Sequence, residues 1–124
     1  MHELKLFALI SWIALPTVMY GGYTLLGSVG DKLTPEQRGL FRAGHAHAGV
    51  LLVLSLAYQL YMAATPLALG VKQGACGALA AGIILQSGGF FWRAFLGEVG
   101  KQFTRVGAFL LAAALIVLIY GLLI

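Results

Sequence analysis

Two arginines and two histidines lie close together at the start of an apolar segment of this 124-residue chain, in the run Arg38-Gly-Leu-Phe-Arg42-Ala-Gly-His45-Ala-His47. Ionisable side chains inside a membrane-spanning helix are costly, and they usually face a bundle interior or a polar cavity. On a helix, Arg38, Arg42 and His45 follow one another at steps of four and three residues, so they share one face. His47 points about 200° away from His45 around the same axis. This segment is therefore the first candidate for chemistry.

The histidine spacing restricts the metal chemistry that this segment can perform. One ion cannot take both imidazoles from a regular helix at a separation of two residues, and the His-x-x-x-His pattern of helical zinc sites is missing. The single Cys76 excludes an internal disulfide and a cysteine metal cluster. Paired carboxylates for general acid–base catalysis are also missing inside the apolar stretches, because the acidic residues lie near their ends: Glu3, Asp31, Glu36 and Glu98. We expect no metal site and no enzyme.

The composition places the chain in a lipid bilayer. Sixty per cent of the residues are hydrophobic and 10% are charged, whereas about 25% are charged in soluble domains. The net charge of +4 is compatible with nucleic-acid binding, but the basic residues cluster between apolar stretches, as orienting charges do. We therefore expect the bilayer, and no nucleic acid, as a partner.

Four uncharged stretches reach roughly the 20 residues that a spanning helix needs, at positions 6–30, 43–71, 73–92 and 106–124. Thr65-Pro66 ends the second helix, because proline disfavours helix in the residue before it. Thr34-Pro35-Glu36-Gln37 begins it, with a capping hydroxyl at Thr34 and a capping-box residue at Gln37. The sequence predicts an all-α, single-domain bundle of four transmembrane helices with short loops, at about 4–28, 35–64, 67–93 and 102–124.

Lysine and arginine predict the orientation. Most basic residues lie in the first and third loops and the adjoining helix ends, namely Lys32, Arg38, Arg42, Arg93, Lys101 and Arg105. By the positive-inside rule these loops are cytoplasmic, and both termini face outward from the inner (plasma) membrane. An aromatic belt is then expected at the cytoplasmic interface, formed by Phe90, Phe91, Trp92 and Phe95.

Distances along the helices predict a polar cluster in the cytoplasmic third of the bilayer. The candidate binding residues are His45, His47, Arg42, Arg93 and Gln86, with the two arginines at the mouth of the cluster. The outer half has no comparable set, and Tyr58 and Gln59 come nearest to one. Any function beyond packing is therefore expected on the cytoplasmic side.

Three interpretations of this cluster remain open. In the first, the histidines hydrogen-bond across helices to Gln86, Ser87 or Tyr23, because lipid cannot satisfy polar groups. In the second, His45 or His47 is an axial ligand of a heme, whose second ligand is Met19 or a histidine of another copy. In the third, the arginines bind an anion or a lipid headgroup at the cytoplasmic surface.

The third predicted helix is rich in small residues. Two ladders of small side chains run along it, one with Gly74, Ala78 and Gly82 and one near Gly77, Ala81 and Gly89. Small residues let helix backbones approach closely in a membrane. The ladders serve either packing inside the bundle or docking of another copy or another subunit.

The four spans, Gly44-His45-Ala46-His47 and the later Gly-Gly-Phe-Phe together resemble small uncharacterised bacterial four-helix membrane families, which implies a fold and no established activity. The arginine-rich second helix is also similar to the membrane-associated eicosanoid and glutathione metabolism family. That family has an asparagine and a glutamate after its arginine, where this chain has Ala46, His47, Ala48 and Gly49, so its glutathione-binding roles do not transfer.

The expected function is that of an accessory or structural subunit in a larger membrane complex or a homo-oligomer. The short loops favour this interpretation, because they offer little surface for a soluble partner. One alternative is a heme- or metal-binding electron-transfer protein that uses the His45/His47 region. Another is a membrane-associated, enzyme-like protein that binds glutathione or lipid.

Overall fold

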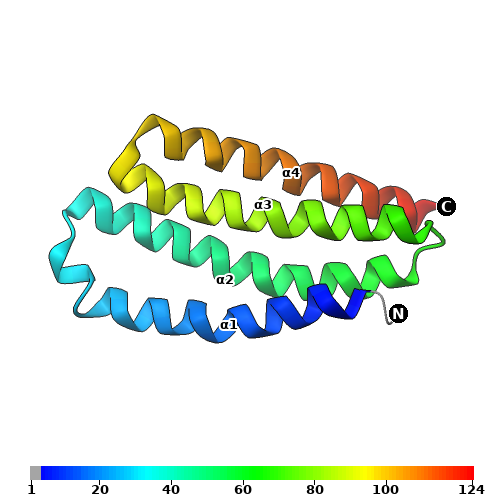
Figure 1. Cartoon of the computed structure of the whole chain (residues 1–124), viewed down its shortest axis with the longest axis horizontal. Coiled ribbons are helices and arrows are strands. Elements are labelled where there is room, and N and C mark those ends of the chain that lie inside the picture. The colour runs from blue at the N-terminus through cyan, green and yellow to red at the C-terminus, as the bar shows by residue number, and fades with distance from the viewer. Residues whose placement is uncertain (1–3) are drawn as a thin grey trace.

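The computed structural model describes residues 4–124, and within them it is entirely helical. It contains the long helices α1 (Lys5–Leu26), α2 (Pro35–Ala64), α3 (Leu69–Leu96) and α4 (Glu98–Leu123), and the short 3-10 helix η2 (Gly30–Lys32) (Figure 1). Each of the four long helices is long and apolar enough to cross a membrane. The predicted all-α class, with four helices of spanning length and apolarity, is confirmed for these residues, while Glu3 lies outside them.

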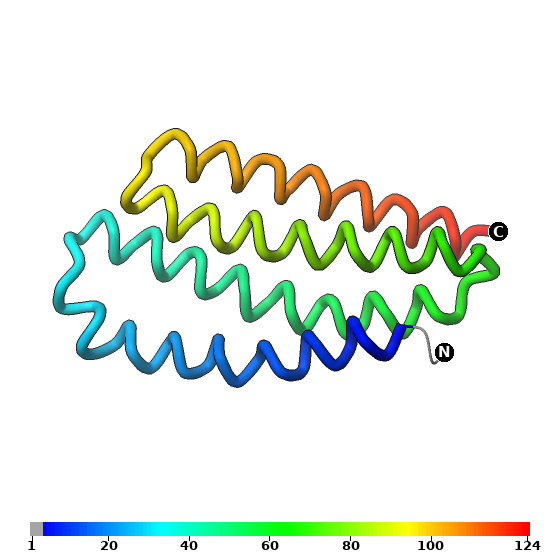
Figure 2. Tube along the Cα trace, in the orientation of Figure 1, coloured from blue at the N-terminus to red at the C-terminus, as the bar shows by residue number. Residues whose placement is uncertain are grey.

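The four helices lie side by side in chain order (Figures 1 and 2). The main contacts are those of α1 with α2, α2 with α3, and α3 with α4, whereas α1 meets α3 only slightly. Ser11 is the one buried residue of α1. The bundle is therefore open, and α1 forms one edge of it.

Glycines bring α3 and α4 together along most of their length. A methyl group on Gly107 of α4 would lie 2.8 Å from the carbonyl oxygen of Gly82, and one on Gly89 of α3 would lie 2.9 Å from that of Gly100. The two backbones therefore touch directly, as small residues permit in membrane helices. Part of the small-residue set predicted on the third helix is thus used within the chain.

The turn between α3 and α4 is shorter than the sequence predicted. The helices were expected to end near residue 93 and to resume at 102, but α3 continues to Leu96 and α4 begins at Glu98. Gly97 alone makes the turn, with a φ of 51° that glycine adopts without steric strain. The prediction failed because it ended the helices at the charged residues Arg93 and Lys101, whereas α3 continues past Arg93 and α4 begins before Lys101.

The capping box predicted at the start of α2 is confirmed. The Thr34 hydroxyl accepts a hydrogen bond of 3.2 Å from the Gln37 backbone N–H, and Gln37 Oε1 accepts one of 3.0 Å from the Thr34 N–H. Gln37 Nε2 also donates to the Ala94 carbonyl at 3.2 Å. One side chain thereby fixes both the first turn of α2 and its position beside the end of α3.

At the opposite end, α2 stops at Ala64 as predicted. Its last carbonyls receive hydrogen bonds from Lys72 Nζ, at 3.2 Å for Ala63 and 2.7 Å for Thr65. Lysine near a helix C-terminus satisfies exposed carbonyls and complements the helix dipole. The α2–α3 connection is therefore held by a side chain of α3.

Candidate functional site

His45 projects from α2 onto a pair of glycines in α1. A methyl group on Gly22 would lie 2.6 Å from His45 Nε2 and 2.9 Å from its Cε1, and one on Gly21 would lie 3.9 Å from its Nδ1. The imidazole therefore occupies space that any other residue at position 22 would fill. His45 therefore packs α2 against α1.

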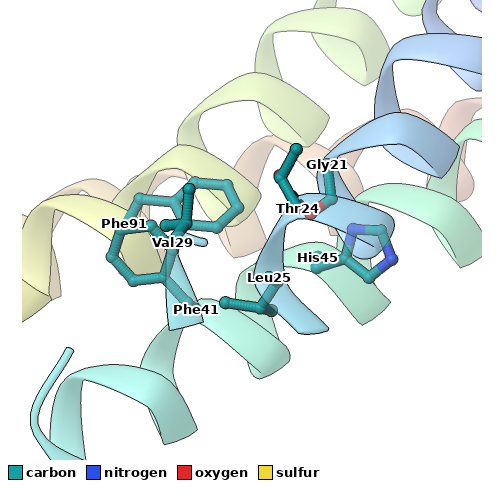
Figure 3. Close-up of a pocket in the computed structure, with 7 residues that line it drawn as sticks. All are labelled: Gly21, Thr24, Leu25, Val29, Phe41, His45 and Phe91. Atoms are coloured by element: carbon teal, nitrogen blue, oxygen red, sulfur yellow. Dashed lines mark hydrogen bonds between the residues drawn. The ribbon is translucent and has the colours of Figure 1, made fainter. Parts of the chain in front are cut away.

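A small pocket adjoins His45 between α1, α2 and α3. Its volume is about 260 Å³, and its lining is mostly apolar: Gly21, Thr24, Leu25, Val29, Phe41, His45 and Phe91 (Figure 3). The Thr24 hydroxyl donates to the Gly21 carbonyl at 2.9 Å and so remains within α1. Because small-molecule sites are usually about 300–1,000 Å³, this pocket is below the size of a typical ligand site.

His47 points toward α3 instead. Its Nδ1 lies 2.8 Å from the Ala43 carbonyl oxygen on its own helix, and its ring centroid lies 4.8 Å from that of Phe90. Because a carbonyl only accepts, Nδ1 carries the hydrogen of this bond. The two histidines therefore diverge, as their spacing predicted. The interhelical hydrogen bond expected for His47 is replaced by one within α2.

Gln86 lies on the other side of α3, where its backbone packs against α4. A methyl group on Gly107 would lie 2.8 Å from Gln86 Cα. Gln86 Oε1 is buried and has no hydrogen-bond partner among the residues that the structure describes. Arg42 and Arg93 are both exposed. The structure thus brings the predicted cluster to one end of the bundle but distributes its members over separate faces.

Arg38 is engaged within the chain. One of its guanidinium nitrogens donates to the Gly30 carbonyl at 2.6 Å, which holds η2 against the first turns of α2. Tyr23, expected as a histidine partner, is 76% exposed. Arg38, one arginine of the predicted anion site, is therefore already hydrogen-bonded to the α1–α2 connection.

The aromatic residues expected as an interfacial belt form pairs between helices. Phe41 of α2 meets Phe91 edge-on at a centroid distance of 5.0 Å and Phe95 at 5.8 Å. Trp92 and Phe103 form a similar pair between α3 and α4 at 4.8 Å. Edge-to-face pairs are worth about 0.5–1.5 kcal/mol beyond the area that they bury. These rings therefore join the helices at this end of the bundle.

The packing around the histidines does not fit an enclosed heme. Nε2 of His45, one candidate axial nitrogen, is directed at the α1 backbone near Gly22, and Met19, the suggested second ligand, is 73% exposed. Within residues 4–124, no three His, Cys, Asp or Glu side chains come together as a metal site would require. Heme ligation by His45 would therefore need α1 to move away from α2.

A buried polar group that the sequence did not predict lies in the other half of the bundle. The hydroxyls of Ser11 in α1 and Ser55 in α2 lie 2.7 Å apart, and Gln59 Nε2 lies 3.5 Å from Ser11 Oγ. Ser55 and Gln59 are one helical turn apart and so share a face, which is a signal that the sequence contained. Ser11 could be identified as their partner only from the way α1 packs against α2.

No family model matches the chain, and neither a curated protein nor a solved structure matches it significantly.

Proposed function

We propose that the protein is a non-catalytic membrane subunit that assembles with a second copy of itself through α3. The observation that carries this proposal is a row of glycines on α3 that pack against no other helix among residues 4–124. A methyl group on any of Gly70, Gly74, Gly77 or Gly88 would meet no other atom within 4 Å. These positions recur at separations that keep them on one face of a helix.

These glycines weaken the isolated subunit. Glycine inside a helix costs up to about 1 kcal/mol relative to alanine. On α3, the cost at Gly82 and Gly89 is offset by the close approach of α4. The glycines of the open face have no such contact within residues 4–124. In a membrane, a face of small residues is the surface that another helix packs against.

The shape of this face favours a two-fold dimer. A hollow of about 240 Å³ lies beside Gly88 and is bordered by Trp92 and Phe103. Ile84, which is 70% exposed, also borders this hollow, one turn before Gly88 on the same helix. Because a two-fold interface is formed by the same patch on both subunits, the partner's hollow is available to this isoleucine.

The proposed topology follows the basic residues. Helix α1 begins and α4 ends at the same end of the bundle (Figure 1), and most lysines and arginines lie toward the other end. By the positive-inside rule, the α1–α2 and α3–α4 connections face the cytoplasm and both chain ends face outward. Labelling of single cysteines placed at Gly97 and at Ile124, each in a Cys76→Ala background, in intact cells tests this orientation.

The dimer is tested with Gly77→Leu, because leucine at this position separates two helices that pack there. The matched control is Gly39→Leu on α2, where a methyl group also meets no atom within 4 Å. We expect the wild-type protein and the control to be dimers by light scattering in detergent and by energy transfer in liposomes. We expect Gly77→Leu to be a monomer with unchanged helix content.

Two outcomes would overturn the proposal. One is a wild-type protein that stays monomeric in both media, and the other is a Gly77→Leu variant that dimerises as well as the control. Stoichiometric co-purification of a different membrane protein that is lost in Gly77→Leu would replace the second copy by that partner.

A further inference from the structure

Pro16 divides α1 into two segments that are held differently. A proline inside a helix lacks the N–H that would bond to the carbonyl four residues earlier, and the helix bends or weakens there. Before Pro16, the buried Ser11 hydroxyl lies 2.7 Å from that of Ser55. Within residues 4–124, the side-chain hydrogen bonds between α1 and α2 all involve Ser11. The segment after the proline, residues 17–26, can therefore move about Pro16 while the first segment stays attached.

His45 is the side chain of α2 that packs on this second segment. A methyl group on Gly22 would lie 2.6 Å from its Nε2, and one on Gly21 would lie 3.9 Å from its Nδ1. The hydroxyl in the adjoining pocket, that of Thr24, donates to the Gly21 carbonyl. Neither nitrogen of His45 forms a hydrogen bond with another of residues 4–124. The ring therefore contacts α1 through packing alone.

The pocket beside His45 is lined from α1, α2, α3 and the turn before η2, and its lining contains no carboxylate. The other titratable and charged residues at this end of the bundle are Tyr23 of α1, Asp31 and Lys32 of η2, Glu36, Arg38, Arg42 and His47 of α2, and Arg93 of α3. The two acids among them, Asp31 and Glu36, are exposed and line no part of the pocket. A positive charge on His45 would therefore have no acidic partner in this contact.

Protonation of His45 would place an unpaired cation in the contact between α1 and α2. Histidine is the side chain that changes charge between about pH 5 and 8, and an unpaired charge between packed helices is costly. Arg42, about one turn earlier on the same face of α2, adds repulsion. The packed arrangement therefore takes up fewer protons than one in which water reaches the ring. Because of this difference, falling pH favours separation of the two helices.

We propose that residues 17–26 form a pH-sensitive flap, which swings away from α2 about Pro16 when His45 is protonated. At higher pH the neutral ring lies on Gly22 and the flap is closed. Acidification opens a gap in which water hydrates the imidazolium, and it widens the pocket of about 260 Å³ that Phe41 and Phe91 line. The flap belongs to α1 and closes on α2, so its movement is independent of the dimer proposed through α3.

The test measures distances between spin labels in the full chain, in liposomes equilibrated at pH 8 and at pH 5, with Cys76→Ala as background. One pair of labels replaces Tyr20 and Ala46 across the flap, and the other replaces Ile13 and Val53 before the proline; all four side chains are exposed. Excess unlabelled protein restricts the measurement to single subunits. We expect a longer distance to appear at pH 5 for the first pair only. Because one proton is linked to opening, the ratio of open to closed changes by up to about tenfold per pH unit.

Two variants connect the response to His45. His45→Gln keeps a polar side chain that cannot be protonated, so we expect the closed distance at both pH values. His47→Gln changes the other histidine of the segment, whose ring packs on Phe90 instead, and it should keep the wild-type response. If His45→Gln does not fold, His45→Phe keeps a ring without a titrating nitrogen and should also give the closed distance at both pH values.

A distance across the flap that is the same at pH 8 and pH 5 in the wild-type background would overturn the proposal. A pH response that persists in the His45 variants, or that is lost in His47→Gln, would also overturn it. Equal changes in both pairs of labels would mean that α1 moves as a whole, which contradicts a flap that turns about Pro16.

Discussion

Gly107→Ala gives the sharpest test of how closely α3 and α4 approach. The added methyl group would lie 2.8 Å from the Gly82 carbonyl oxygen and 2.8 Å from Gln86 Cα, and it would also contact the Gln86 backbone nitrogen. These are backbone atoms of a helix, so they cannot rotate away as a side chain would. The two helices must separate around position 107, which loosens neighbouring contacts as well.

The expected magnitude is the difference of two effects. Overpacking a close interface costs about 1–3 kcal/mol, and a rigid backbone neighbour places this site toward the upper end. Alanine recovers up to about 1 kcal/mol relative to glycine in a helix. We expect the free energy of unfolding to fall by about 2 kcal/mol. The matched control is Gly39→Ala, where the methyl group meets no atom within 4 Å, so only the helix preference acts and stability should rise slightly.

The assay is reversible unfolding in mixed micelles, with rising SDS and helix content followed by circular dichroism. Both variants are compared with the wild-type protein at one protein concentration below that at which it dimerises. A Gly107→Ala variant that is as stable as the wild-type protein, or that gains stability as Gly39→Ala does, would contradict this prediction. That result would mean that α3 and α4 do not pack backbone to backbone.

Four further predictions use the same preparation. Tyr58→Phe should cost about 1 kcal/mol in the same unfolding assay, because the Tyr58 hydroxyl donates to the Ala114 carbonyl at 2.8 Å in a buried site; an unchanged midpoint would show that this bond is not formed. Thr34→Ala removes the capping hydroxyl of α2 and should cost about 1 kcal/mol, whereas Thr17→Ala, at an exposed hydroxyl inside α1, should cost less. Lys72→Met should destabilise the α2–α3 connection, because two carbonyls lose their donor; faster hydrogen exchange at residues 62–72 checks this, and equal exchange would contradict it. The purified protein should show no Soret band, since His45 Nε2 faces the α1 backbone and the His47 ring packs on Phe90; a Soret band lost in His45→Ala or His47→Ala would restore the heme interpretation.

For the predicted polar cluster, the sequence indicated the depth of each residue in the membrane but not the direction of its side chain. Depth in the membrane placed His45 and Gln86 in the cytoplasmic third with Arg93 at its mouth, and the structure keeps them at that end of the bundle. Depth contains no information about rotation around the helix axis, and rotation directs His45 at α1 and Gln86 toward α4. Which of several polar groups meet is decided by how each helix is turned toward its neighbours.

For the small residues of α3, too, the sequence did not indicate which of them contact a neighbouring helix. The sequence identified ladders containing Gly74, Gly77, Gly82 and Gly89 but could not divide them between packing and docking. The structure buries Gly82 and Gly89 against α4 and leaves Gly74 and Gly77 open. Close backbone approach is a property of a helix pair, so a single helix sequence shows only that such an approach is possible.

The sequence by itself determined the four spanning helices, the capped start of α2 and the divergence of the two histidines. Each of these follows from local physics, because lipid forces the backbone into helices and the helical rotation per residue is constant. Only the tertiary structure decided that α1 lies at an open edge, that Ser11 meets Ser55, and that Gln59 Oε1 is buried without a partner among residues 4–124. These features depend on contacts between residues far apart in the chain, where close packing selects one arrangement among many that the same pattern of apolar residues allows.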